Sequence, residues 1–182
     1  VDDIDIRNYD LLEYRKQISV VLQDVFLFSD SVKNNISLND ETIGMERIEK
    51  AAIEVGAMDF IKRLPGAFEF QVMERGAMLS VGQRQLISFI RAYVNNPRIL
   101  ILDEASSSID SESEELIQQA TEKLTSQRTS IVIAHRLATI QNADRIIVLD
   151  QGRIMEAGNH QQLLKQNGLY RQLYEIQFLH ID

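Results

Sequence analysis

The stretch RILILDE, residues 98–104, decides the fold of this chain. Its first five residues are almost wholly apolar, which is typical of a short strand buried on both faces of a parallel sheet. Residues 129–134 (TSIVIA) and 145–149 (RIIVL) predict two further buried strands. Helical patterns separate these runs, and strands alternating with helices predict an α/β fold with a largely parallel sheet.

The rest of the chain is assigned outward from these strands. Residues 17–23 (QISVVLQ) predict another strand, and the opening VDDIDIR also has a strand-like pattern. Apolar spacing predicts helices at 46–57, 58–64 and 86–94, whereas 27–38 is mixed and loop-like. Towards the end we expect a helix with Leu116, Ile117, Ala120 and Leu124 inside, a short helix at 137–141, a hairpin turning at Gln151-Gly152, and amphipathic helices at 160–165 and 168–179.

Composition limits the class of function. The 182 residues carry a formal net charge of −8, which argues against a nucleic-acid partner, because such a partner requires a basic face. There is no cysteine, so cysteine-ligated zinc and disulfide scaffolds are excluded. No apolar run approaches the ~18 residues that span a bilayer. The chain starts at Val1 inside a charged phrase, and we expect it to be a segment of a longer protein.

Two polar groups follow predicted strands directly. Asp103 and Glu104 come after the first, and His135 comes after the strand at 129–134. Ligands of open parallel sheets bind outside the carboxyl ends of the strands, so we expect these side chains to face one crevice. An acid pair there suits magnesium-nucleotide chemistry, although two acids are also common at the start of a helix.

The segment LSVGQ, residues 79–83, opens the predicted helix at 86–94. Ser80 and Gln83 match a capping box, which accounts for both residues without any ligand. Gly82 is not explained in this way, because glycine costs roughly 1 kcal/mol relative to alanine within a helix. Its presence indicates that something approaches the backbone there, and a helix N-terminus favours an anion.

Taken together, these motifs resemble the ATP-binding cassette (ABC) ATPase family over nearly the whole chain. LSVGQ resembles the family's signature motif, ILILDEA its Walker B strand, residues 107–110 its D-loop and His135 its switch histidine. Gln23, in VVLQDVFLFS, matches the Q-loop glutamine. The phrases VLQDVFLFSDSVKNNI and AHRL are most similar to exporter-type transporters.

The resemblance implies a P-loop NTPase-like sheet with an inserted helical subdomain. It implies three segments: residues 1–23 are the remainder of the N-terminal nucleotide-binding core and end at the Q-loop, 24–94 are the helical subdomain with the signature motif, and 95–182 are the C-terminal core. It also implies that the N-terminal part of the domain, with its phosphate-binding loop, lies before Val1. No G-x-x-x-x-G-K-[ST] motif occurs in these residues, so we expect them not to hydrolyse ATP alone.

The resemblance also implies a role for each matched residue, with ATP and Mg²⁺ as cofactors. Asp103 would hold Mg²⁺ through water, Glu104 would be the general base, and His135 would contact the γ-phosphate. Gln23 would approach the metal and the nucleophile. A second nucleotide-binding domain, identical or different, would present its ATP to Ser80, Gly82 and Gln83. Asp110, the fourth nucleotide-site candidate, would sit at the interface of the two domains and link their sites.

A transmembrane domain of the same transporter is the other implied partner, which would place the chain at the cytoplasmic face of the cell membrane. Residues 25–28 (VFLF) are candidates for docking that domain, with ordinary core packing as the alternative. Two residues depart from the family pattern. Val81 replaces the first glycine of the signature, and Met73 replaces a small residue in the loop that senses the membrane domain.

Taken singly, Gln23, His135 and Asp110 have simpler interpretations, namely a surface amide, a structural histidine and a helix cap. Two other functions stay open at this point: a soluble, non-transport ABC ATPase, and a non-catalytic segment that only pairs with a partner. Transmembrane segments upstream would favour the transporter, and a coiled-coil insert or a basic arm would favour the soluble enzyme.

Overall fold

The computed structural model describes residues 1–103, 111–126, 128–134 and 137–178. They form two compact units, Val1–Ile133 and Ala134–Asp182. The first unit contains a three-stranded parallel sheet and most of the helices, and the second contains a hairpin with three short helices. The three functional segments inferred from the sequence, with boundaries after residues 23 and 94, stay a prediction.

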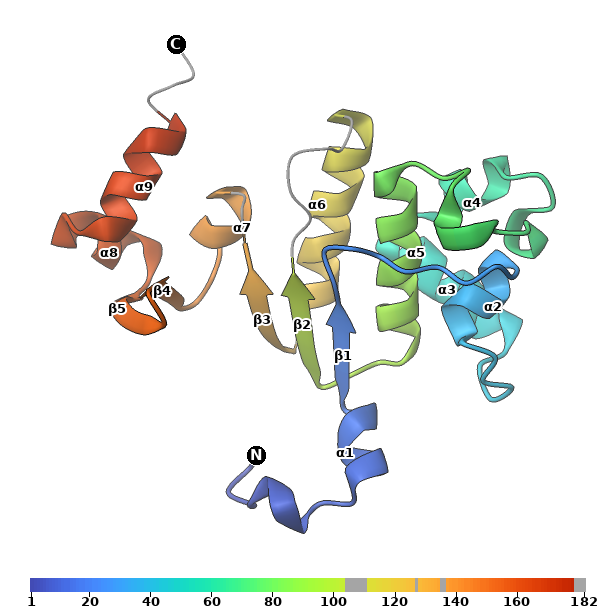
Figure 1. Cartoon of the computed structure of the whole chain (residues 1–182), viewed down its shortest axis with the longest axis horizontal. Helices are drawn as coiled ribbons and strands as arrows, with labels where there is room; N and C mark the ends of the chain where they lie inside the picture. Colours follow the sequence, from blue (N-terminus) through green and yellow to red (C-terminus); the bar gives the residue numbers. More distant parts are fainter. Residues whose placement is uncertain (104–110, 127, 135–136, 179–182) are drawn as a thin grey trace. The chain divides into compact units, whose positions relative to one another are not determined.

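The sheet of the first unit has the strand order β1-β2-β3, from β1 (Ile18–Val21), β2 (Ile99–Asp103) and β3 (Thr129–Ile133). Both pairings are parallel, with Val21 opposite Leu102 and Asp103 opposite Ile133. The three strands predicted from the sequence at these places are confirmed. All three carboxyl ends consequently lie at one edge of the sheet (Figure 1).

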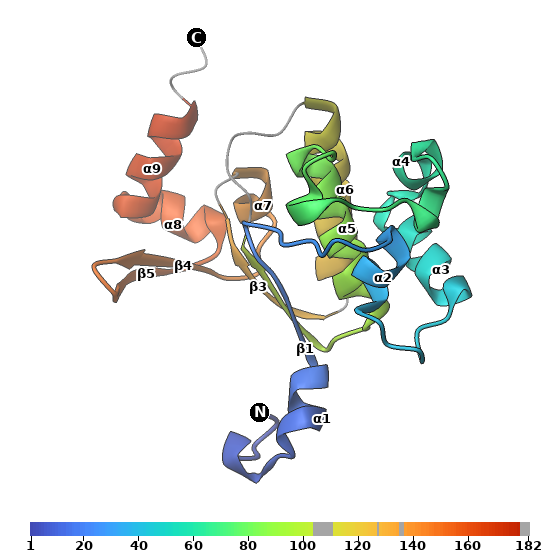
Figure 2. The same cartoon turned by 45° about the vertical axis from the view of Figure 1, so that its right-hand side comes forward.

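Helices α5 (Val81–Val94) and α6 (Ser111–Thr125) pack side by side against one face of this sheet (Figure 2). Helices α2 (Val32–Ser37), α3 (Met45–Val55) and α4 (Met58–Arg63) lie on the far side of α5 from the strands. Short 3₁₀ turns η2 (Ala67–Glu69) and η3 (Glu74–Gly76) lead from α4 back to α5. The helical stretch expected between the first two strands is therefore present.

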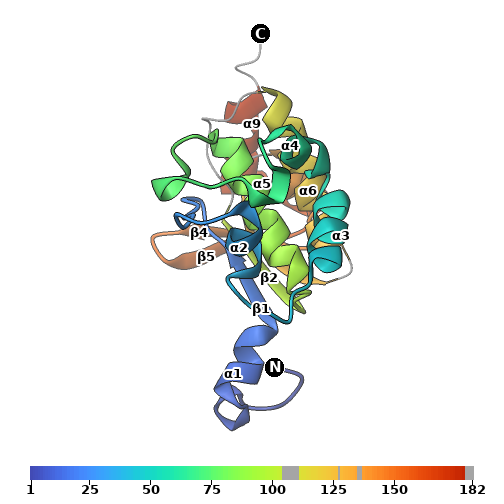
Figure 3. The same ribbon diagram turned by 90° about the vertical axis from the view of Figure 1, so that its right-hand side faces the viewer.

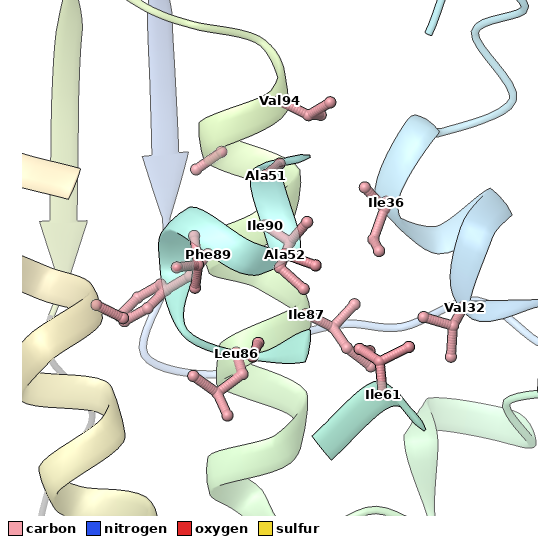
Figure 4. Packing of buried hydrophobic residues seen from close by; sticks show 14 of the residues in the cluster. Val32, Ile36, Ala51, Ala52, Ile61, Leu86, Ile87, Phe89, Ile90 and Val94 are labelled. Atoms are coloured by element: carbon pink, nitrogen blue, oxygen red, sulfur yellow. The ribbon is translucent and has the colours of Figure 1, made fainter. Parts of the chain in front are cut away.

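The apolar core of this unit is centred on α5. Figure 4 shows side chains of α2, α3 and α4 meeting the inner face of α5, and the fully or almost fully buried members include Val32, Ile36, Ala52, Ile61, Leu86, Ile87 and Ile90. Burial of one such aliphatic side chain contributes about 1.5–3 kcal/mol. The predicted inner face of α6 is confirmed, since Ile117, Ala120 and Leu124 are buried and Leu116 is partly buried against the same core.

Two local predictions in the N-terminal part are wrong. The opening VDDIDIR forms no strand; it leads into a 3₁₀ turn, η1 (Ile6–Asn8), which the Asp5 side chain caps by accepting from the Arg7 amide. Helix α1 (Leu11–Lys16) follows, capped by Asp10, and η1 and α1 lie beyond the amino end of β1 (Figure 3). Asp5 caps a 3₁₀ turn and Asp10 caps a helix. These local hydrogen bonds outweigh the strand-like alternation of apolar and polar residues.

Residues 27–38, predicted as loop, contain α2. Ser31 caps it by accepting from the Asn34 amide at 3.1 Å. Val32 and Ile36, one turn apart, are both buried. Six residues are too few for a helical period to stand out in the sequence, so packing against the core determines this helix.

The prediction that the strands are buried on both faces of the sheet is also wrong. Along β2 only alternate residues, Leu100 and Leu102, are buried, and β3 has no fully buried residue. Helices cover one face of the sheet, and the other face leaves Val20, Ile131 and Ile133 exposed.

In the second unit, β4 (Ile146–Asp150) pairs antiparallel with β5 (Arg153–Gly158). The turn at Gln151-Gly152 is confirmed, but β4 is not a buried strand of the parallel sheet as predicted, and only Val148 is buried in it. Helix α7 (Leu137–Gln141) precedes the hairpin, and α8 (His160–Gln166) and α9 (Leu169–Phe178) follow it.

A small core of Val148, Leu163 and Tyr170 holds this unit together. Glu156 of β5 accepts hydrogen bonds from the backbone amides of Leu169 and Tyr170 and so caps α9. Its carboxylate lies so close to Gly168 that a Cβ at that position would force the Glu156 side chain to move.

Candidate functional site

Two of the predicted site residues lie at the carboxyl edge of the parallel sheet. Asp103 is the last residue of β2 and is partly exposed. Gln23 lies two residues beyond the end of β1, and its side chain is exposed. Because β1 and β2 are adjacent and parallel, this order brings an amide and a carboxylate to the same edge, as the sequence predicted.

Glu104, Asp110 and His135, which we expected at the same site, lie outside the described residues. Their neighbours in the sequence are described. Glu104 directly follows Asp103, and β3 ends at Ile133, opposite Asp103. The roles of these three residues stay predictions.

The signature-like segment lies at the N-terminus of α5. The end of α5 connects to the start of β2, so α5 runs antiparallel to the strands and begins at the end of the unit where the strands finish (Figure 1). Ser80 is exposed and Gln83 is half-buried, while Gly82 is buried. The segment thus shares one end of the molecule with Asp103 and Gln23.

The predicted capping box is present at this helix. The Ser80 hydroxyl accepts from the Gln83 amide at 3.2 Å, and the Gln83 side chain accepts from the Ser80 amide at 3.0 Å. The box satisfies two backbone donors, and a hydroxyl oxygen with one such bond still has its O–H to donate. Capping and ligand binding by Ser80 are therefore compatible.

A residue that we did not single out holds the backbone before this helix. Arg84 donates to the carbonyl of Leu79 at 2.6 Å, and its aliphatic stem lies against Gly76. Gly76 has a positive φ of 72°, and a Cβ there would come within 2.8 Å of the Arg84 side chain. This close approach holds the backbone in place directly before α5. The sequence did not reveal the contact, because an arginine five residues after a leucine is too common a pattern to indicate one.

Residues 25–28 divide between core and surface. Leu27 is fully buried, whereas Phe26 and Phe28 are 54% and 52% exposed, with their rings edge to face at a centroid distance of 5.1 Å. Met73 is 56% exposed as well. Core packing thus accounts for Leu27, whereas docking of a transmembrane domain stays a prediction for the two phenylalanines.

Asn35 and Arg91 hold this aromatic segment in place. The Asn35 amide group accepts from the Phe28 backbone amide at 2.8 Å and donates to the Phe28 carbonyl at 3.0 Å. Arg91 of α5 donates to the Asn35 carbonyl at 2.7 Å and, at 3.4 Å, to the carbonyl of Phe26. Burial lowers the pKa of the Arg91 guanidinium. The clamp joins α5 to a segment more than 50 residues earlier, and separation along the chain is why sequence patterns did not reveal it.

Magnesium and a nucleotide are the groups that this edge would take. Carboxylate and amide oxygens are ligands that Mg²⁺ accepts, and Mg²⁺ usually keeps several waters and takes only one or two carboxylates. Asp103 fits that requirement. Among the described residues, no three acidic or histidine side chains gather as a metal site of their own.

None of the helices in the described part of the chain is both long enough and apolar enough to cross a membrane.

Comparison with known proteins identifies the family. The sequence model described as "ABC transporter" matches residues 1–107. An uncharacterised ABC transporter ATP-binding protein, YknV of Bacillus subtilis, is 50% identical over 178 residues, which are 98% of this chain and 30% of that protein. An ATP-dependent lipid A-core flippase of Shewanella oneidensis is 48% identical over 98% of this chain and 30% of its own length.

A solved structure agrees with these relatives. The structure of a bacterial Atm1-family ABC exporter with ATP bound matches 97% of this chain with a TM-score of 0.86 and 38% sequence identity, and the match covers 31% of that exporter. The chain thus spans about a third of the length of the proteins it matches. Its α/β fold is of the P-loop NTPase kind, and the chain belongs to the ABC transporter family, in which it is similar to the nucleotide-binding domain of exporters.

Proposed function

We propose that this chain forms part of the ATP-binding and ATP-hydrolysing domain of an exporter, at the cytoplasmic face of a membrane. The observation that carries the proposal is the edge where Asp103 and Gln23 follow adjacent parallel strands, with the Ser80 helix start at the same end. The match to an ATP-bound exporter supports it.

In this proposal Asp103 holds Mg²⁺ through a bound water, and Gln23 contributes its amide oxygen at the metal. Bound Mg²⁺ would neutralise charge on the phosphates as the γ-phosphoryl group is transferred. Glu104 accepts a proton from the attacking water, and the His135 side chain donates a hydrogen bond to a γ-phosphate oxygen. Water is the nucleophile, and the products are ADP and phosphate.

A second nucleotide-binding domain completes the site. Ser80, Gly82 and Gln83 bind the γ-phosphate of the ATP that the second domain holds, since the backbone amides and dipole at the start of α5 attract an anion. Asp110 lies at the contact between the two domains. Val81 brings a branched side chain to this contact, so we expect weaker binding there than a glycine would allow.

The transmembrane region of the same transporter is the second partner. Phe26, Phe28 and Met73 are its contact residues in this proposal, because they are large, apolar and more than half exposed. Arg91 bonds to the backbone of the same segment. A movement of the docked partner would therefore reach α5 directly.

The test is a chimera in which these 182 residues replace the matching segment of the Bacillus subtilis relative. We expect the chimera to hydrolyse Mg-ATP and Glu104→Gln to lower the rate by about 100-fold or more while ATP still binds, since general-base catalysis contributes about 10²–10⁴-fold. Steady-state ATPase assays and binding of a labelled ATP analogue measure the two effects.

Glu49→Gln, at an exposed position of α3 on the far side of α5 from the strands, removes the same charge away from the sheet edge and is the matched control. Full activity of the Glu104→Gln chimera would contradict the assignment of the base. A chimera that folds and binds ATP but never hydrolyses it would contradict the proposed enzyme activity and support a pairing role.

A further inference from the structure

We propose that a pocket at the opposite end of the sheet binds a small soluble phosphate monoester of a polyol. The pocket has a volume of about 670 Å³ and is lined by Arg98, Lys123, Arg128, Glu54, Tyr93 and Ser126, among others. Arg98 precedes β2 and Arg128 precedes β3, so it lies at the amino ends of these strands, whereas Asp103 and Gln23 lie at the carboxyl edge. The proposal is independent of ATP hydrolysis.

Size and shape suit a small ligand. Pockets for small molecules commonly measure about 300–1,000 Å³. The lining comes from the ends of α3, α5 and α6 and from two strand starts, all in the first compact unit. The lining therefore combines helix ends with the two connections that lead into β2 and β3, and it does not depend on a single surface loop.

The charges that line the pocket favour an anionic ligand. Three of the lining side chains are cations and one, Glu54, is an acid, in a chain whose formal net charge is −8. None of the three cations has an ion-pair partner among the described residues. The C-terminal ends of α5 and α6 carry about half a negative charge each, which reduces the positive excess without reversing it.

Arg128 provides the most specific observation. Its guanidinium lies over the Tyr93 ring, 5.7 Å from the centroid, which orients it by a cation–π contact. One of its terminal nitrogens, Nη1, is buried and has no hydrogen-bond partner in the described part of the chain. An ionised donor without an acceptor is costly, and a ligand oxygen would remove that cost.

Phosphate fits this donor set better than a single carboxylate. Guanidinium groups match phosphate oxygens in pairs, and a lysine adds a point charge. A phosphate monoester has three terminal oxygens, enough for one contact to each cation. Two further lining groups can accept hydrogen bonds: the Glu54 carboxylate and the Ser126 hydroxyl, which already donates to the Lys123 carbonyl at 2.8 Å. They suit hydroxyl groups on the ester.

Equilibrium dialysis of the 182-residue chain against radiolabelled glycerol 3-phosphate tests the proposal. We expect saturable binding at millimolar concentrations that weakens as salt is added. Arg98→Gln and Lys123→Gln should each weaken it by roughly fivefold or more, through loss of a charge-assisted hydrogen bond. Glu54→Gln should strengthen it, because the acid is lost and the acceptor oxygen is kept.

Lys62→Gln on α4 makes the same charge change away from the pocket and is the matched control. It should leave binding unchanged. Circular dichroism melts establish that each variant is folded, and Arg98 is exposed, so its replacement serves if Lys123→Gln unfolds the chain.

Three results would overturn the proposal. The first is an absence of saturable binding to the folded chain. The second is equal weakening by Lys62→Gln and Lys123→Gln, which would indicate general charge attraction. The third is a lower melting temperature for folded Lys123→Gln and Arg98→Gln with unchanged binding, which would make these cations structural only.

Discussion

At the scale of single residues, a buried polar side chain determines the position of an exposed segment of the surface. Asn35 is fully buried, yet its amide group makes hydrogen bonds to the backbone on both sides of Phe28. A buried polar group that is satisfied in this way specifies one backbone course. The exposed pair Phe26 and Phe28 therefore owes its position to a side chain that is itself fully buried.

Replacing Asn35 tests this dependence. Asn35→Ala should lower the free energy of unfolding by about 2–3 kcal/mol, because the Phe28 amide and carbonyl lose their partner. Urea denaturation followed by circular dichroism measures the change. Asn8→Ala, at an exposed position in η1, should change stability by less than about 0.5 kcal/mol. Equal effects of the two substitutions would contradict the clamp.

At the scale of elements, the start of α5 has two tasks that can be separated. The capping box at Ser80 and Gln83 stabilises the helix, and in our proposal the same residues bind phosphate. Sequence reasoning could predict the box, since capping depends on residues three apart. It could not decide between the two tasks, because both use the same hydroxyl.

Two substitutions at Ser80 distinguish them. Ser80→Ala removes the cap and should cost about 1 kcal/mol of stability. Ser80→Asp keeps a good N-cap but adds a negative charge where a γ-phosphate would bind, so we expect near-normal stability and a strong loss of ATPase activity in the chimera. Melting temperatures and ATPase rates of both variants measure the two effects. Normal activity of Ser80→Asp would refute phosphate binding there.

Other elements show where sequence reasoning succeeds and fails. The strands β1 to β3 and helices such as α3 were predictable, because each has a clear period or a dense apolar run. Helix α2 was missed because only Val32 and Ile36 carry its pattern. Residues 145–149 resembled a strand of the parallel sheet because an apolar run does not reveal its partner, which here is β5.

The candidate site likewise contains residues that the sequence could predict and residues that it could not. Asp103 could be placed at the edge from the order of strands and polar residues alone, whereas Gln23 was assigned to the site by the family resemblance. Arg84, Arg91 and Asn35 could not, because their contacts join segments distant in the chain or depend on a positive φ at Gly76.

At the scale of the whole molecule, the chain spans about a third of each relative and contains no phosphate-binding loop in its 182 residues. We expect the isolated chain to show no ATP hydrolysis above background, whereas the chimera hydrolyses ATP. A phosphate-release assay on both proteins makes the comparison. Turnover by the isolated chain that disappears in Glu104→Gln would refute the expectation.

The bare face of the parallel sheet has a practical consequence. Ile131 and Ile133 are 56% and 51% exposed, and among the described residues β3 pairs only with β2. The edge of β3 that does not face β2 therefore presents unpaired backbone amides and carbonyls to other molecules in solution. Self-association should rise with protein concentration, so dilute samples and light scattering belong in every measurement on this chain.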